Sequence, residues 1–139
     1  MAEKKEVQER YMEYQMLTQQ FQQIQQNIQA LDKHVNDLSG LKQNIETISE
    51  LKSNKETLIP LGNGIFLKGE LKDSKNVIMN VGSDIFVEKT TNEAIETVEK
   101  QLGEVTNFLE QMQHEVIRTH ARITELQEEF KDLRENELV

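Results

Sequence analysis

Apolar residues recur at alternating spacings of three and four along the first third of the chain. The run consists of Val7, Tyr14, Leu17, Phe21, Ile24, Ile28, Leu31, Val35 and Leu38, with Arg10 as its polar member. This heptad spacing places the side chains in one narrow stripe of a helix, which is typical of a coiled-coil seam. The next apolar residue, Leu41, comes one position early and predicts a local irregularity of the seam.

A second run with the same spacing follows near the C-terminus. It consists of Ile95, Val98, Leu102, Val105, Leu109, Met112, Val116, Thr119, Ile123, Leu126, Phe130 and Leu133. Thr90, followed three residues later by Glu93, predicts a capping box at the start of this helix. Because a narrow stripe cannot bury itself, the two helices are predicted to pair antiparallel, with both termini at the same end.

The pattern changes in residues 55–90, where short apolar runs flank turn residues. Strands are predicted at 58–61 and 65–70 around Gly62-Asn63-Gly64, and at 76–81 and 85–88 around Gly82-Ser83-Asp84. Two successive β-hairpins are therefore expected.

The apolar residues of these hairpins come in triplets, namely Ile65, Phe66, Leu67, Val77, Ile78, Met79, Ile85, Phe86 and Val87. Successive strand residues point to opposite faces, so both faces need cover, and hairpins this small are marginally stable with unpaired edges. We interpret the hairpins as a module for assembly with other chains. A monomer whose hairpins fold back on the helices is the alternative.

The predicted fold class is mainly α with a small β part. A long antiparallel coiled-coil hairpin of two helices carries two central β-hairpins. We expect a single domain over 1–139, in which 1–54 and 91–139 are helical arms and 55–90 is the assembly module.

Composition narrows the possible partners. Apolar residues make up 36% of the 139 residues and charged residues 29%, which favours solvated helices over a compact globule. The formal net charge is −9 without a basic stripe, so neither nucleic acid nor a membrane surface is an expected partner. The N-terminus lacks the apolar region of a secretory signal, and no run is long enough to span a bilayer, so a cytoplasmic location is predicted.

Candidate chemistry is sparse. The chain has no cysteine, and His114 and His120 are about 240° apart around a helix, the wrong spacing for a shared metal. Gly62-Asn63-Gly64 precedes a predicted strand, so no helix N-terminus is available to bind a phosphate there. We predict no catalytic residues, no metal and no cofactor, and hence no enzyme.

Some apolar residues near the termini fall outside the seam. They are Tyr11, Met12, Met16, Leu138 and Val139. In an antiparallel hairpin these positions are neighbours, and exposed apolar side chains there predict a surface that binds apolar segments of other proteins. A longer seam or frayed helix ends would explain them equally well.

The stretches "TLIPLGNGIFLKGELKD" and "VIMNVGSDIFVEK" resemble the hairpin block of prefoldin alpha-class subunits. They combine an apolar-Pro-apolar-Gly strand end, a Gly turn, a Lys-x-Glu strand and a second Gly-turn hairpin. The resemblance implies an ATP-independent holding chaperone, a hexamer of two alpha-class and four beta-class subunits. It also implies that the hairpins join into a double β-barrel platform, and that the arm tips hold unfolded clients for delivery to a group II chaperonin.

The resemblance assigns the platform role to the nine residues of the hairpin triplets. It assigns client binding at the tips to Val7, Tyr11, Met12, Tyr14, Met16, Leu17, Leu126, Phe130, Leu133 and Leu138. A second hypothesis is a scaffold or co-regulator subunit of a prefoldin-like complex that binds one specific native partner.

Overall fold

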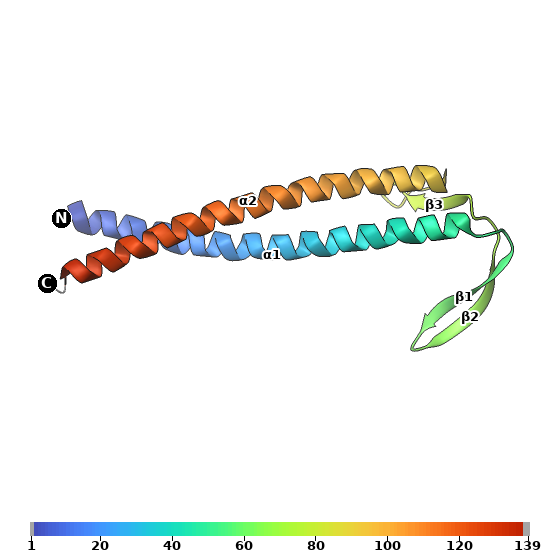
Figure 1. The fold of residues 1–139 in the computed structure, drawn as a ribbon, viewed down its shortest axis with the longest axis horizontal. Helices are drawn as coiled ribbons and strands as arrows, with labels where there is room; N and C mark the ends of the chain where they lie inside the picture. Colours follow the sequence, from blue (N-terminus) through green and yellow to red (C-terminus); the bar gives the residue numbers. More distant parts are fainter. Residues whose placement is uncertain (1, 138–139) are drawn as a thin grey trace. The chain divides into compact units, whose positions relative to one another are not determined.

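The computed structural model describes residues 2–137, and side chains are described from residue 4 to residue 134. The elements are α1 (Ala2–Glu50), β1 (Lys55–Gly62), β2 (Ile65–Leu71), β3 (Asn76–Asn80), β4 (Phe86–Thr90) and α2 (Thr91–Glu137) (Figure 1). The predicted order of helix, two β-hairpins and helix is confirmed. Strand limits differ from the predicted ones by up to three residues, and α1 ends four residues before the predicted end of the first arm at 54.

The chain forms two compact units. The first combines residues 1–34 with residues 105–139, and the second consists of residues 35–104. The first unit therefore contains the beginning of α1 and the end of α2. The second contains the remaining parts of both helices and the two hairpins between them.

In the first unit, the helices pair antiparallel. Arg10 Nη1 lies 3.3 Å from Glu129 Oε2, and the rings of Phe21 and His120 have centroids 5.6 Å apart. Residues further along α1 thus contact residues nearer the start of α2, which is the order expected of antiparallel helices. The described seam positions from Tyr14 onward are buried or half-buried, with Ile24, Ile123 and Leu126 the most deeply buried apolar residues of this unit. The two heptad stripes are the contact surface, as predicted.

In the second unit, the seam continues without the predicted irregularity. The Leu41 side chain is 44% exposed, whereas Leu38 and Ile45 are buried and Lys42 between them is half-buried. Lys42 Nζ lies 3.2 Å from Glu99 Oε1 on α2. The prediction based on Leu41 was wrong because the aliphatic stem of a lysine can fill a seam position while its ammonium group reaches a carboxylate.

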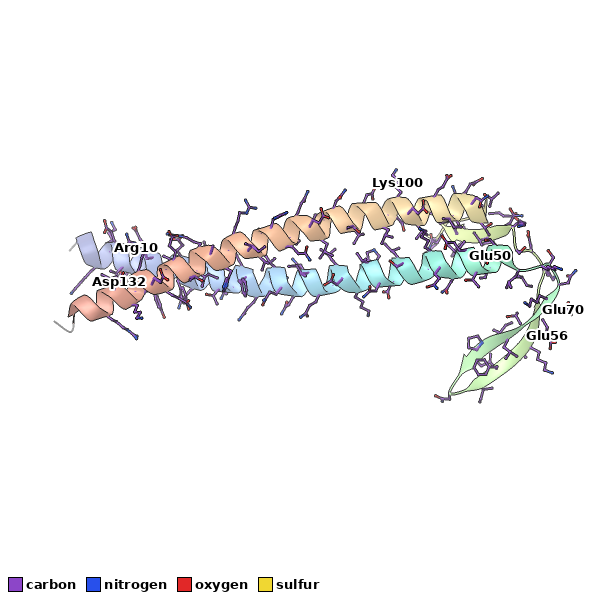
Figure 2. The ribbon with its side chains drawn as sticks, in the orientation of Figure 1. Arg10, Glu50, Glu56, Glu70, Lys100 and Asp132 are labelled. Carbon is purple, nitrogen blue, oxygen red and sulfur yellow. The ribbon has the colours of Figure 1, made fainter. Side chains whose placement is uncertain are left out.

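In the second unit, α2 contributes small and branched residues to the seam. Ala94 and Val98 of α2 are almost fully buried. Charged residues outside the seam, such as Lys100, project outward from the helix into solvent (Figure 2). This division of apolar seam and polar surface is what a two-helix pair requires, because each helix has one buried stripe and remains solvated elsewhere.

At the start of α2, the hydroxyl half of the predicted capping box is formed. The backbone N–H of Glu93 donates to Thr90 Oγ1 at 3.1 Å, which satisfies one of the free N–H groups of the first turn. The backbone N–H of Thr91 donates to the carbonyl of Lys75 at 2.9 Å. This bond ties the entry of α2 to the segment that precedes β3.

The two hairpins are separate two-stranded antiparallel sheets, β1 with β2 and β3 with β4. In the first, Ile59 lies opposite Leu67 and Pro60 opposite Phe66, and the register shifts between Pro60 and Gly62. In the second, Met79 lies opposite Val87.

Both turns use residues with positive φ. Asn63 and Gly64 have φ of 48° and 78°, and Ser83 and Asp84 have φ of 51° and 58°. Two-residue turns of this hand match the right-handed twist of the flanking strands. The turn chemistry therefore explains why these segments form hairpins.

No helix within residues 2–137 is long and apolar enough to cross a membrane.

Candidate functional site

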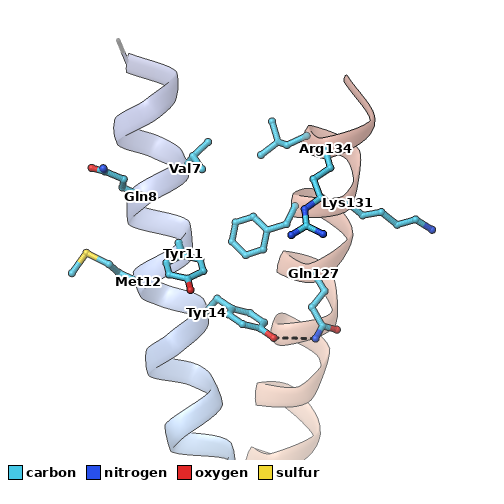
Figure 3. A pocket seen from close by; sticks show the side chains of 10 residues that line it. Val7, Gln8, Tyr11, Met12, Tyr14, Gln127, Lys131 and Arg134 are labelled. Atoms are coloured by element: carbon cyan, nitrogen blue, oxygen red, sulfur yellow. Dashed lines mark hydrogen bonds between the residues drawn. The ribbon is translucent and has the colours of Figure 1, made fainter. Parts of the chain in front are cut away.

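The paired helix segments of the first unit form an open pocket of about 900 Å³, here called the terminal pocket (Figure 3). It is lined by Val7, Gln8, Tyr11, Met12, Tyr14, Gln127, Phe130, Lys131, Leu133 and Arg134. The first five belong to α1 and the others to α2. The pocket therefore depends on the antiparallel pairing of two segments that are far apart in the sequence.

Three aromatic rings form the centre of the terminal pocket. The rings of Tyr11 and Tyr14 meet the ring of Phe130 edge to face, with centroid distances of 6.2 Å and 5.8 Å. The Tyr14 hydroxyl accepts a hydrogen bond of 3.2 Å from Gln127 Nε2 (Figure 3). Such rings offer large apolar contact area with few rotatable bonds, which lowers the entropy lost when a ligand binds.

Part of this apolar surface faces solvent. Tyr11 is 53% exposed and Met12 is 68% exposed. Met12 and Gln8 point away from α2 and form the outer edge of the pocket on α1 (Figure 3). Packing between the helices does not account for the apolar Met12 at this position, because neither Met12 nor Gln8 is buried in the seam. An exposed apolar cluster of this kind is typical of a surface that contacts another protein.

Ion pairs cross-link the two helices beside the pocket. Arg122 Nε and Nη2 donate to the two carboxylate oxygens of Glu13 at 3.0 and 3.2 Å, and Arg122 Nη1 donates to Glu125 Oε2 at 2.9 Å. The hydrogen bond from Arg122 lowers the pKa of the Glu13 carboxyl, and the charges of Arg122 and Arg10 lower it further. This bidentate pair holds α1 and α2 together one residue before Tyr14.

The lining also includes residues that the sequence analysis did not select. Gln8, Gln127, Lys131 and Arg134 are polar, whereas the predicted binding surface consists of apolar and aromatic side chains. The last three follow the spacing i, i+4, i+7, so they share one face of α2 beside the seam. Their position next to seam residues was the available signal.

The predicted client-binding residues are distributed as follows. The terminal pocket includes Val7, Tyr11, Met12, Tyr14, Phe130 and Leu133. Met16 is 59% exposed but lies outside the lining, and Leu17 is half-buried in the seam. Leu126 is fully buried, so it packs the helices together and has no surface to offer a ligand. Leu138 lies outside the described residues.

Both hairpins also carry apolar side chains, and those of the predicted triplets are here together called the hairpin surface. Ile65, Phe66, Leu67, Ile78, Ile85, Phe86 and Val87 are all exposed, and Val77 and Met79 are half-buried. The extreme cases are Ile78 at 75% and Phe86 at 63% exposure. Within the described chain, seven of the nine side chains therefore keep more than a third of their surface open to solvent, and so many exposed apolar side chains are unusual on a monomer surface.

The two hairpins differ in how their faces are covered. On the β3–β4 hairpin, Val77 and Met79 share the half-buried face, whereas Ile78 and Phe86 share the exposed one. On the β1–β2 hairpin, Ile59 and Leu67 lie on one face and Pro60 and Phe66 on the other, and all four are exposed. The first hairpin therefore has two apolar faces in contact with solvent.

The first hairpin also contains two glutamates that face each other across its strands. Glu56 lies directly opposite Glu70 in the β1–β2 register (Figure 2). Two carboxylates in this position repel each other. A basic side chain from another chain would relieve the repulsion.

These surfaces offer little basis for a metal site or for catalysis by histidine. Among the described residues, no group of three or more His, Asp or Glu side chains is arranged to hold a metal ion. The His120 ring packs beside Phe21 in a shallow, mainly apolar groove with Ile28 and Ile117. What the geometry offers is apolar contact area at two separate surfaces.

Comparison with known proteins places this fold. The family model described as prefoldin subunit matches residues 4–135. The filamentous PFD of Methanocaldococcus jannaschii, solved by cryo-EM, is similar with a TM-score of 0.69 at 20% sequence identity, over 81% of this chain and 93% of that one. A comparison with curated protein sequences gave no significant match. Since the family model spans nearly the whole sequence, the chain is a member of the prefoldin family.

Proposed function

We propose that this chain is a subunit of an ATP-independent holding chaperone that binds non-native polypeptides at its terminal pocket. Prefoldins are a family of non-enzymatic chaperones, and membership supports a chaperone-type function. The observation that carries the proposal is the exposed aromatic and methionine cluster around Tyr11, Met12 and Phe130. Unfolded chains expose the apolar side chains that such a cluster would bury.

The energetics favour weak, reversible capture. Burying one large apolar side chain contributes about 1.5–3 kcal/mol. A dissociation constant of 1 mM already requires about 4 kcal/mol, so a single pocket holds one apolar residue only transiently. Several pockets in one assembly that bind the same client gain avidity by a factor of about 10² to 10⁴. Capture then depends on assembly, and release needs no nucleotide.

Assembly is the role we propose for the hairpin surface. Its exposed side chains and the free edges of two-stranded sheets fit strand pairing with neighbouring subunits, which would bury Phe66 and Phe86. We propose that the chain is an alpha-class subunit, two copies of which join four beta-class subunits around a β-barrel platform. The similar structure from Methanocaldococcus jannaschii is described as a filament, so open self-assembly is the competing arrangement.

The same hypothesis includes the fate of the client. We propose that the assembly acts in the cytoplasm and passes its clients to a group II chaperonin. Cross-linking of the loaded complex to that chaperonin tests this step.

A light-scattering assay tests the function. The complete assembly should suppress the aggregation of a chemically denatured client on dilution. Tyr11→Ser together with Met12→Ser should weaken suppression and leave the assembly intact in native mass spectrometry. Phe66→Asp together with Phe86→Asp should disrupt the assembly first.

Failure of the intact assembly to reduce scattering at a molar excess over client would refute the holding function. Native mass spectrometry of the chain, alone and with a beta-class partner, separates a closed hetero-oligomer from a filament of identical subunits.

A further inference from the structure

The terminal pocket carries local positive charge in an acidic protein. Its lining contains Lys131 and Arg134 and no carboxylate, although the whole chain has a net charge of −9. Both cations are exposed. No ion pair among the described side chains involves either of them, whereas Arg10 is paired with Glu129 and Arg122 with Glu13 and Glu125. Two positive charges at the pocket are thus available to a ligand.

The placement of these cations relative to the rings matters. Arg134 lies four residues after Phe130, so the two share a face of α2, and its guanidinium points toward the space between the helices (Figure 3). Lys131 points away from α1 at the outer edge of the pocket (Figure 3). A segment that rests an apolar side chain on Tyr11 and Phe130 would have its neighbouring residues beside these cations.

We propose that the terminal pocket selects non-native segments in which an apolar or aromatic residue is flanked by Asp or Glu. This inference rests on the proposed function and adds a substrate class to it. Basic flanks would instead face Lys131 and Arg134 with like charge. The net negative charge of the chain repels acidic segments at long range, but salt screens that field beyond about 8 Å at physiological ionic strength. Within the pocket lining itself, the charged side chains are these two cations.

Three labelled peptides test the proposal by fluorescence anisotropy with the full-length assembled protein. They share one Leu-Phe-Leu centre and carry flanks of Glu, Gln or Lys. The acidic peptide should bind roughly three- to tenfold more tightly than the basic one at physiological salt, which is the size expected for two solvent-exposed ion pairs gained or lost. The difference should nearly vanish at 1 M salt, where the screening length is about 3 Å.

Two matched variants locate the effect. Lys131→Gln with Arg134→Gln should abolish the preference and retain binding of the Gln-flanked peptide. Lys33→Gln with Arg118→Gln is the control. It also removes one lysine and one arginine charge from the first unit, but outside the pocket lining, and it should retain the preference. Circular dichroism confirms that both variants are folded.

Equal affinities for the acidic and basic peptides would overturn this inference while leaving the holding function standing. A preference that survives the Lys131 and Arg134 double variant, or one that persists in 1 M salt, would also overturn it. Failure of all three peptides to bind would also overturn this inference, and the light-scattering assay decides separately whether the holding function stands.

Discussion

Replacing Leu126 with alanine separates the seam from the terminal pocket. Leu126 is fully buried, although its position near the terminal pocket made it a candidate contact residue. The substitution removes three carbon atoms, and burial of each contributes about 0.8 kcal/mol. A partly collapsed cavity adds up to about 1 kcal/mol, so we expect a loss of about 3 kcal/mol, within the range of about 2–5 kcal/mol known for buried leucines.

The assay is thermal unfolding followed by far-ultraviolet circular dichroism. In a chain of this length, each kcal/mol corresponds to about 2–4 °C, so Leu126→Ala should lower Tm by about 6–12 °C. All samples must have the same chain concentration and assembly state, because association shifts Tm. Met12→Ala is the matched control, since Met12 is 68% exposed and surface changes stay within about 0.5 kcal/mol. Alanine is the best helix former, so intrinsic helix propensity cannot explain a loss.

A Leu126→Ala midpoint within 2 °C of the Met12→Ala midpoint would refute the assignment of Leu126 to the seam. A large loss for Met12→Ala would show instead that the terminal pocket is closed in solution. The two variants should differ in the opposite sense in client capture. At temperatures below its unfolding midpoint, Leu126→Ala should still suppress client aggregation, whereas Met12→Ala should suppress it less.

Three further predictions concern single contacts. Arg122 lowers the pKa of the Glu13 carboxyl below its ordinary value of 4.5. The Glu13–Arg122 bond therefore stabilises the fold fully above pH 4.5, and this contribution is lost as the pH falls through the lowered pKa. Glu13→Gln should flatten the acid side of a plot of Tm against pH. Thr90→Ala removes the cap that accepts the Glu93 N–H and should cost about 1 kcal/mol in urea unfolding. Asp84→Gly should gain about 0.5–1 kcal/mol in the same assay, because glycine adopts the φ of 58° without strain.

Each of these predictions has an outcome that contradicts it. Parallel acid profiles of wild type and Glu13→Gln would mean that the ion pair adds no pH-dependent stability. An unchanged unfolding midpoint for Thr90→Ala, with Thr90→Ser as control, would show that the cap is dispensable. Destabilisation by Asp84→Gly would indicate a side-chain role for Asp84 that outweighs its backbone conformation.

Much of the fold follows from local patterns. The three-four spacing from Tyr14 to Leu38 and from Ile95 to Leu133 identifies both helices, because the period of a helix is set by its backbone and not by its neighbours. Residues that accept positive φ locate both hairpin turns for a similar reason. Local patterns fix the ends of helices and strands less sharply. The helix α1 ends at Glu50, four residues before the predicted end of the first arm at 54.

The site depended more strongly on tertiary contacts. Spacing alone favoured Leu41 as a seam residue, yet the partner helix presents Glu99, and Lys42 takes that place. Spacing also cannot show that Lys131 and Arg134 share a pocket with Tyr11, which precedes them by more than one hundred residues.

What the sequence determined by itself is the period of each segment, the hand of each turn and the presence of apolar residues beyond the needs of one seam. Only the tertiary structure decided which of those residues are enclosed, as Leu126 is, and which stay open, as Met12 does. The physical reason is that burial depends on the axial alignment and rotation of two paired helices. These are properties of the contact between segments, and no local spacing encodes them.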